Sequence, residues 1–279
     1  MATTFEIYIQ HENARCARQA ARAAFNELDR LEAELSRFVE NSDISRINNL
    51  AAGQCARVGL DAFECLYKSL QMCIETDGAF DVTFGSPQAV NSAEVGSMNL
   101  IKLNETDFTV ELLKSPLKID LGGIGKGYAL DKMAELLREW SIDVVLLHGG
   151  YSSVLALNAP ANTKEKGWPV TLSNPRNRRQ TLDYLYLQNR AMSGSGLQWG
   201  QHIIDPRQAK PVEGKVIAWS CADDATTADA LSTAFMVMTL NEIEQYCSNH
   251  PHVQAFVILE HEGKEVPEGK ILRFGSWDF

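Results

Sequence analysis

The sequence predicts an α+β fold, because helical and strand-like segments are mixed along the chain without a regular β-α-β alternation. Three observations carry this prediction. A long amphipathic helical pattern lies near the N-terminus, a glycine-rich turn joins a strand to a helix near the middle, and short apolar strands fill much of the second half. The chain has 279 residues without a repeat, linker or low-complexity tract, so we expect one domain over 1–279.

The N-terminal part is expected to hold a strand and two helices. Residues 4–10 alternate apolar and polar side chains, as in a half-buried strand. Apolar residues then recur at steps of three or four over 14–38, which predicts one long amphipathic helix. A second helix is expected to begin at Asp61, with Glu64 as its capping-box partner, and to end at residue 77.

The remaining elements follow from apolar runs and turn residues. A loop rich in small and polar residues is expected over 85–96, and a helix should follow the glycine-rich turn at 122–127. A further helix should be capped at Thr226 or Thr227, another should start at residue 241, and the C-terminal tail is expected to be irregular. Strands are expected over 100–103, 108–113, 117–121, 144–148, 154–157, 169–172, 182–187, 215–219 and 253–259.

Composition excludes some function classes. The chain carries 26 basic and 36 acidic residues, a net charge of −10, which argues against binding to nucleic acid or to an anionic membrane. A small phosphorylated ligand in a local pocket is not excluded. The first nine residues indicate a strand and not a secretory leader, and no segment is apolar enough to span a membrane, so we expect a cytoplasmic protein.

The six cysteines point to no metal or redox motif. No two of them have C-x-x-C spacing, which argues against zinc ribbons and thioredoxin-like sites. Cys16, Cys65 and Cys73 lie within helical apolar patterns, where we expect buried reduced thiols.

The glycine-rich turn at 122–127 is the first candidate site. Glycines allow a ligand to approach the backbone closely, the N–H groups at a helix start favour an anion, and Lys126 adds a positive charge. The spacing matches neither the Walker A loop nor the Rossmann G-x-G-x-x-G pattern. A tight turn without a ligand is an equally good interpretation of the spacing alone.

The second candidate site is Gln201-His202-Ile203-Ile204-Asp205-Pro206-Arg207. His202 and Asp205 are three residues apart beside a proline that fixes the backbone, which suits an oriented general base. A histidine near a strand is more often an ordinary surface or core residue, and that alternative stays open.

The third candidate site is the segment 223–233. Asp229 and Thr233 are four residues apart and share one face of the expected helix, where a carboxylate and a hydroxyl suit Mg²⁺. The alternative is a helix start whose acidic side chains serve as caps, which is our interpretation of Asp223 and Asp224. Asp229 lies within an apolar pattern, and because an unpaired carboxylate there would be costly, a functional partner is favoured.

The combination of these segments resembles the FAD:protein FMN transferase family, also called ApbE-like. Further matching segments are the opening Met1-Ala2-Thr3-Thr4-Phe5, the helix end Leu35-Ser36-Arg37-Phe38, the turn Asn41-Ser42-Asp43-Ile44-Ser45-Arg46-Ile47-Asn48, the segment Asp77-Gly78-Ala79-Phe80-Asp81-Val82-Thr83 and the longest signature, Asp120-Leu121-Gly122-Gly123-Ile124-Gly125-Lys126-Gly127-Tyr128-Ala129-Leu130-Asp131. The resemblance covers residues 1 to about 240.

The resemblance implies a two-lobed α+β domain, related to the T-fold, with FAD in a cleft between the lobes. It implies a Mg²⁺-dependent transfer of FMN from FAD to a threonine or serine hydroxyl of an acceptor flavoprotein, with release of AMP. Some members instead hydrolyse FAD to FMN and AMP. A flavin-binding protein that has lost transfer and serves as a carrier or sensor is the alternative from another class.

The resemblance also assigns roles to residues. His202 would be the general base and Asp205 would hold the turn or the ring. Mg²⁺ would be bound by Asp229, Thr233 and the carbonyl oxygen of Gly125. The FAD-contacting positions would be Met1, Phe38, Ala79, Phe80, Asp81, Gly122, Lys126, Tyr128 and Ile203.

The sequence departs from the family pattern in three segments. Leu147-His148-Gly149-Gly150-Tyr151 stands where an Asn-x-Gly-Gly-Asp sequence is usual, so a polar pair is missing, with His148 and Tyr151 as candidate substitutes. Gly194-Ser195-Gly196 replaces Thr-Ser-Gly, and the segment between residues 85 and 95 is short. These changes bear on the acceptor more than on the cofactor.

Overall fold

The computed structural model of the protein describes residues 3–83, 100–161, 167–175, 177–197, 203–260 and 271–276. The loop expected over 85–96 lies outside these ranges. Met1 and His202 also lie outside them.

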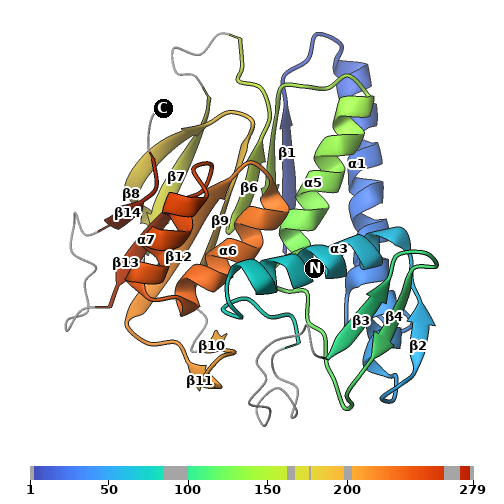
Figure 1. The fold of residues 1–279 in the computed structure, drawn as a ribbon. Coiled ribbons are helices and arrows are strands. Elements are labelled where there is room, and N and C mark those ends of the chain that lie inside the picture. The colour runs from blue at the N-terminus through green and yellow to red at the C-terminus, as the bar shows by residue number, and fades with distance from the viewer. Residues whose placement is uncertain are drawn as a thin grey trace.

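A seven-stranded antiparallel sheet forms the centre of the fold (Figure 1). Its strands, in spatial order, are β1 (Phe5–Ile9), β5 (Val145–Gly149), β6 (Ser153–Ala156), β9 (Arg190–Gly196), β12 (Lys215–Ala222), β13 (Gln254–Leu259) and β14 (Ile271–Phe274). Strand β12 is buried along its whole length, because it lies inside the sheet and is covered on both faces. This burial explains its almost continuous run of apolar residues.

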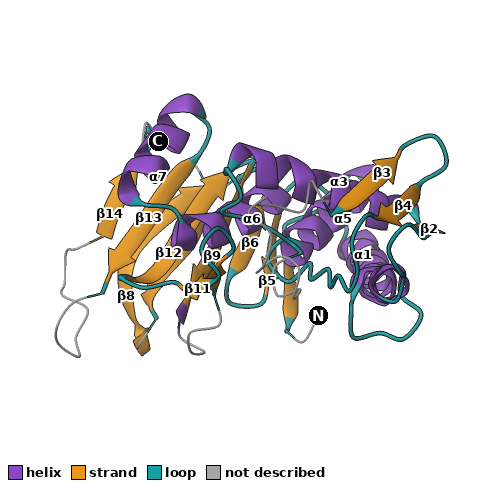
Figure 2. Ribbon diagram, turned by 60° about the horizontal axis from the view of Figure 1, so that its bottom comes forward, coloured by secondary structure: helices purple, strands orange, loops and turns teal. Residues whose placement is uncertain are grey.

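Helices cover one face of this sheet, as Figures 1 and 2 show. The described helices are α1 (Ala14–Leu35), α2 (Asp43–Asn48), α3 (Leu60–Glu75), α5 (Gly125–Glu139), α6 (Ala225–Val237) and α7 (Leu240–Asn249). Helices α5, α6 and α7 contact the strands of the sheet, while α1, α2 and α3 pack on α5, on α6 or on one another. The larger apolar core lies between these helices and the sheet. Helices α5 and α6 pack side by side against it, and they bring the glycine-rich turn next to the segment 223–233.

The other face of the sheet is covered in part by a hairpin of β7 (Trp168–Asn174) and β8 (Asn177–Leu187). A second, smaller apolar core lies between the hairpin and strands β6, β9, β12 and β13. Alternation along β7 separates its two faces, because Val170 and Leu172 pack toward this core while Pro169 and Thr171 are exposed.

Two small sheets complete the described fold. Strands β2 (Cys55–Arg57), β4 (Thr109–Leu112) and β3 (Ile101–Asn104) form one of them, beside α1 and α3. Strands β10 (Ile204–Asp205) and β11 (Lys210–Pro211) form the other.

The structure confirms the α+β class and corrects several local predictions. The long helix ends at Leu35, and a short unpredicted helix, α2, follows with Ser42 as its N-cap. The capping box expected at Asp61 and Glu64 does not form, because α3 starts one residue earlier and Gly59 is its N-cap. No strand forms over 117–121.

Two corrections concern the C-terminal half. Helix α6 is capped by Asp224 and not by Thr226 or Thr227, because the Asp224 side chain accepts the N–H of Thr227 at 2.8 Å. The interpretation of Asp224 as a cap is therefore confirmed. The tail expected to be irregular contributes β14 to the sheet.

Two further expectations concern membranes and thiols. None of the described helices has the length and apolar character that a membrane crossing requires. All six cysteines are free, Cys65 and Cys73 are buried as expected, and Cys16 is half-buried.

Candidate active site

The glycine-rich turn is held by Asp120 and opens into α5. The Asp120 carboxylate accepts the N–H of Gly122 at 2.9 Å and pairs with the guanidinium of Arg37 at 2.9 Å. The Asp120 N–H donates to the carbonyl of Val82 at 2.8 Å, so the turn is tied to the segment after α3. Helix α5 begins at Gly125, and no side chain caps its N-terminus. A helix start of this kind is suited to an anion.

Gly127 lets α5 and α6 approach closely. A Cβ atom at this position would lie 2.0 Å from the carbonyl oxygen of Ala225 and 2.9 Å from the Cβ atom of Asp229. No larger residue fits without a backbone shift. The close approach places Asp229 against the first turn of α5.

The Asp229 carboxylate is buried, with 2% of the residue exposed, and four groups donate to it. From α5, Lys126 Nζ lies 3.0 Å from Oδ1 and the N–H of Gly127 donates to Oδ2 at 3.1 Å. From the sheet, the hydroxyls of Ser193 and Ser153 donate to Oδ1 at 2.8 and 3.2 Å. These donors offset the cost of burying the charge.

Thr233 lies one helical turn after Asp229 and beside the glycine-rich turn. Its hydroxyl lies 3.1 Å from the hydroxyl of Ser195, and a Cβ atom on Gly123 would lie 3.2 Å from it. The structure therefore brings Asp229 and Thr233 to the start of α5, where the sequence places Gly125.

This donor set fits Mg²⁺. A carboxylate, a hydroxyl and a main-chain carbonyl are hard oxygen ligands, and Mg²⁺ is usually bound by one or two carboxylates while it keeps waters or substrate phosphates. No group of three or more His, Cys, Asp or Glu side chains suited to a metal occurs in the described residues. The residues thus fit a magnesium site that is completed by water and substrate, and not a zinc site with nitrogen and sulfur ligands.

A cavity of about 470 Å³ opens beside these groups. Of the residues predicted to contact the cofactor or the metal, seven line it: Ala79, Phe80, Asp81, Gly122, Lys126, Ile203 and Thr233. They come from the segment after α3, the glycine-rich turn, the approach to β10 and helix α6. The cavity thus unites four parts of the chain.

A second cavity, of about 530 Å³, adjoins the first. Both are lined by Asp120, Gly122 and Lys126. Phe38 stands at the second cavity with 80% of its surface exposed, and the Arg37 guanidinium lies 4.1 Å from its ring centre. An exposed aromatic ring beside a cavity is suited to stacking on a planar ligand. Gly125 also lines this cavity.

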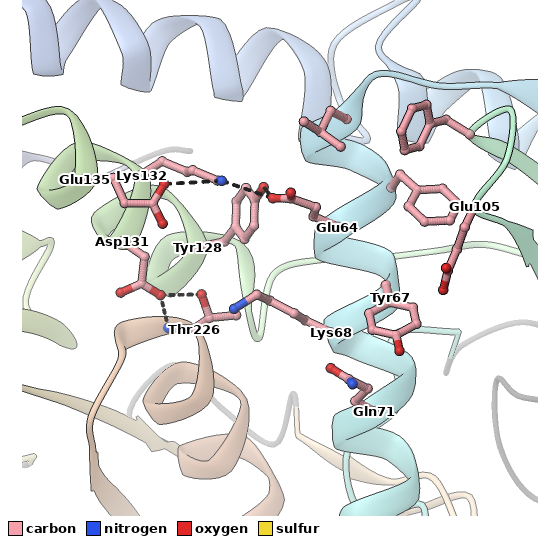
Figure 3. A pocket seen from close by; sticks show the side chains of 13 residues that line it. Glu64, Tyr67, Lys68, Gln71, Glu105, Tyr128, Asp131, Lys132, Glu135 and Thr226 are labelled. Atoms are coloured by element: carbon pink, nitrogen blue, oxygen red, sulfur yellow. Dashed lines mark hydrogen bonds and ion pairs between the residues drawn. The ribbon is translucent and has the colours of Figure 1, made fainter. Parts of the chain in front are cut away.

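Tyr128 does not join these residues. Its side chain is buried between α3 and α5, with its hydroxyl 2.9 Å from Glu64 (Figure 3). The same hydroxyl lies 2.8 Å from Asp61. Burial and these two carboxylates raise the pKa of Tyr128. It lines a separate cavity of about 610 Å³ together with Asp131. The structure therefore places the phenol on a different side of α5 from Asp229.

Asp205 holds a turn and does not line the cavity. It is 7% exposed, and its carboxylate accepts the N–H of Arg207 at 2.8 Å and the side-chain amide of Gln208 at 3.1 Å. Arg207 also pairs with Glu242 of α7 at 2.7 Å. Asp205 therefore fixes the β10–β11 turn. His202, the predicted base, lies outside the described residues, while Ile203 beside it lines the cavity.

Five polar residues of the site were not singled out from the sequence. Arg37 and Asp120 stand within segments that carry the family resemblance, and that signal was available. Ser153 and Ser193 are paired neighbours on β6 and β9, and Ser195 lies two residues further along β9. Ser153 and Ser193 meet α6 only through the sheet pairing, so no local pattern marks them. Ser195 stands in Gly194-Ser195-Gly196, where the family pattern has Thr-Ser-Gly, and that signal was available.

Comparisons with known proteins show the family of the chain. A model described as the ApbE family matches residues 1–257. The FAD:protein FMN transferase of Klebsiella pneumoniae strain 342 is 24% identical over 289 residues, which cover 92% of this chain and 81% of the relative. The enzyme of the same name from Vibrio cholerae O395 is 25% identical over 268 residues, which cover 85% of this chain and 79% of the relative.

Solved structures show the same fold. The ApbE protein of Thermotoga maritima superposes with a TM-score of 0.82 at 25% identity, covering 98% of this chain and 94% of that one. The flavin transferase ApbE of Vibrio cholerae gives a TM-score of 0.80 at 20% identity, covering 99% and 94%.

Proposed function

The chain belongs to the ApbE family, and on that premise we propose that it is an FAD:protein FMN transferase. Its relatives from Klebsiella and Vibrio bear this name. The observation that best supports the proposal is the buried Asp229 carboxylate, which pairs with Lys126 at 3.0 Å, because Lys126 lines the cavity of about 470 Å³ together with Thr233. A binding protein without chemistry has little need for such a costly buried charge.

We propose that Mg²⁺ binds to Asp229, Thr233 and the carbonyl oxygen of Gly125. When bound, the ion neutralises charge on the pyrophosphate as it breaks. Lys126 adds a fixed positive charge at the same place, and the N–H groups of the glycine-rich turn are suited to the phosphate oxygens. Phe38 stacks on a planar ring of FAD from the neighbouring cavity.

The proposed transfer has one bond-forming and one bond-breaking event. The hydroxyl oxygen of a threonine or serine in the acceptor flavoprotein bonds to the FMN phosphorus. The bond from that phosphorus to the bridging oxygen breaks, and AMP leaves. His202 accepts the hydroxyl proton as general base. Asp205 contributes by fixing the turn that follows His202 in the chain.

We propose that this reaction takes place in the cytoplasm. The support is the set of six free cysteines, because free thiols are typical of a reducing compartment.

A single experiment tests the function. The protein is incubated with FAD, Mg²⁺ and a flavoprotein fragment that carries an acceptor threonine, and the products are identified by mass spectrometry. We expect an FMN adduct on the fragment and free AMP. Free FMN without an adduct would indicate hydrolysis, and unchanged FAD would indicate a carrier or sensor.

Asp229→Ala is the matched variant for the same assay. We expect it to abolish Mg²⁺-dependent AMP release and to leave weak FAD binding, because the cavity walls stay in place. Unchanged turnover in this variant would overturn the metal assignment.

A further inference from the structure

A third cavity, of about 500 Å³, lies on the sheet face opposite α5 and α6. Its floor is a row of cross-strand neighbours, in which Glu6 of β1 pairs with His148 of β5, His148 with Val154 of β6, and Val154 with Met192 of β9. The β7–β8 hairpin covers the neighbouring part of the face. The cavity is therefore a groove over the half of the sheet that the hairpin leaves open.

One wall of this groove is the edge of β7. All seven residues from 169 to 175 line it, although side chains in a strand alternate between two faces. A groove that touches consecutive residues runs along the edge of the strand and not over one face. Strand β7 pairs only with β8 among the described residues, which place no second strand on this edge.

Pro169 shows which backbone groups face the groove. A proline has no N–H, and within a sheet it is tolerated where its nitrogen faces away from the partner strand. The N–H and C=O of Thr171, two residues further, point to the same free edge. Tyr184, opposite Thr171, agrees with this direction, because its N–H donates to the Asp183 side chain at 2.9 Å.

The groove meets the candidate active site at Ser152. This residue lines both the groove and the cavity of about 470 Å³. Its hydroxyl lies 3.4 Å from that of Ser153, which donates to Asp229 at 3.2 Å. A side chain that enters at Ser152 therefore reaches the cavity at a residue that is linked to the Asp229 carboxylate through the Ser153 hydroxyl.

We propose that this groove binds the acceptor protein as an extended segment that adds to the free edge of β7 and delivers its threonine or serine hydroxyl at Ser152. The inference rests on the proposed function. A folded protein does not enter a cavity of about 470 Å³, but one side chain of an extended segment does. Strand addition binds main-chain groups and leaves alternate side chains to give specificity.

The charges of the groove limit the sequence of the segment. Glu6 is the one acidic or basic side chain among the described residues that line it, apart from His148. Burial lowers the pKa of His148, so its imidazole is neutral at pH 7. The residue of the acceptor segment that lies over Glu6 should therefore be neutral or basic.

The test compares Thr171→Pro with Thr171→Val. The proline removes the N–H at the free edge and blocks strand addition there, while its ring suits an unpaired edge position. The valine removes only the hydroxyl. The probe is the flavoprotein fragment that carries an acceptor threonine. With Thr171→Pro we expect the KM for the fragment to rise at least tenfold while FAD affinity is unchanged, and Thr171→Val should match wild type.

Hydrogen exchange of the wild-type protein provides a second measurement. We expect addition of the fragment to protect the Thr171 amide within 169–175. No protection there, or equal KM values for the two variants, would overturn the proposal that the acceptor segment binds in the groove. If Thr171→Pro loses FAD affinity, the hydrogen-exchange measurement on the wild-type protein alone decides whether the acceptor segment binds to β7. A wild-type protein that leaves the fragment unmodified in the presence of FAD and Mg²⁺ would overturn the proposed function itself.

Discussion

The Asp229 carboxylate shows how the site is held at the level of single residues. It combines near-complete burial with donors from α5, β6 and β9. Lys126 supplies the only full positive charge among the donors described for it, and its ammonium group lies where a metal ion bound to Asp229 would compete. We can therefore test whether Mg²⁺ replaces the Lys126 ammonium group as the partner of Asp229.

We predict that Lys126→Met lowers the free energy of unfolding by about 3 kcal/mol or more, because it leaves a buried carboxylate without its cation. Mg²⁺ should restore part of this loss and should stabilise the variant more than the wild type. Thermal unfolding with and without Mg²⁺ measures both effects.

The matched control for this prediction is Lys132→Met. Lys126 and Lys132 have similar exposure, 23% and 22%, but the two nearest partners of Lys132, Glu64 and Glu135, are 37% and 58% exposed, and its third partner, Asp61, lies 3.9 Å away. An ion pair at that exposure contributes about 1 kcal/mol or less, so the control should lose little and should not respond to Mg²⁺. Equal losses in the two variants would contradict the role given to Lys126.

Spacing along the chain predicted some of these residues and missed others for a physical reason. Asp229 and Thr233 were predicted because a four-residue spacing places two side chains on one helix face. Ser153 and Ser193 are 40 positions apart and become neighbours only when β6 and β9 pair. Tyr128 shows the converse, since its place in a signature does not reveal that its side chain points toward α3.

At the scale of elements, the packing of α5 on α6 depends on one glycine. We predict that Gly127→Ala lowers the free energy of unfolding by several kcal/mol, because the new Cβ would lie 2.0 Å from the backbone oxygen of Ala225. Urea unfolding measures the loss, and FAD affinity should fall with it.

Gly125→Ala is the control in the same helix. Its new Cβ would meet only the Cβ of Leu121, at the ordinary distance of 3.7 Å, and its carbonyl oxygen is retained. We expect unchanged or slightly higher stability, by up to ~1 kcal/mol from helix propensity. If Gly125→Ala is as unstable as Gly127→Ala, the turn tolerates no added side chain in general. The loss in Gly127→Ala would then not come from its contact with Ala225.

A second link between these helices is Asp131 of α5, which accepts the N–H groups of Ala225 and Thr226 at the start of α6, each at 2.8 Å. Burial, together with the nearby Asp224 carboxylate, raises the pKa of Asp131 from 3.8 to about 6. Between these two values the folded chain retains a proton that the unfolded chain has lost. The contribution of this group to stability is therefore full below about pH 4 and is lost as the pH rises through 6.

We predict that the stability of wild type relative to Asp131→Asn falls as the pH rises from 4 to 6, by up to ~1.4 kcal/mol per pH unit, and is constant above pH 7. Urea unfolding across this range measures the difference. Asp223→Asn, at an exposed carboxylate near the same helix start, supplies the baseline. A difference that grows with pH would contradict the raised pKa.

Element prediction succeeded where periodicity was strong and failed where pairing alone defines the element. The long apolar pattern over 14–38 predicted the start of α1 and placed its end a few residues beyond Leu35, and β12 was recognised from its apolar run. Strand β9 was missed because Arg190–Gly196 is rich in small and polar residues, and its burial comes from neighbours on both sides. Strands β10 and β11 have two residues each, too few to show any period.

At the scale of the whole molecule, the candidate active site and the groove lie on opposite faces of the sheet and meet at Ser152. Helices α5 and α6 carry Lys126 and Asp229 on one face, and the groove beside β7 lies on the other. The first cavity draws its walls from segments between residues 79 and 233, and the adjoining cavity extends this range to residue 3. We therefore propose that residues 1–279 fold as one domain, because both cavities need distant parts of the chain in place.

This proposal predicts how FAD changes unfolding. A ligand at 100 times its Kd stabilises the folded state by ~2.7 kcal/mol, which corresponds to a rise in Tm of roughly 5 °C for a chain of this size. We expect one cooperative transition that moves as a whole, seen at the same temperature by far-UV and near-UV circular dichroism. Phe38→Ala should reduce the shift, because the exposed ring loses its stacking contact while the core is untouched. Two transitions, of which FAD moves only one, would show that the chain contains two separable units and that the cavities belong to one of them.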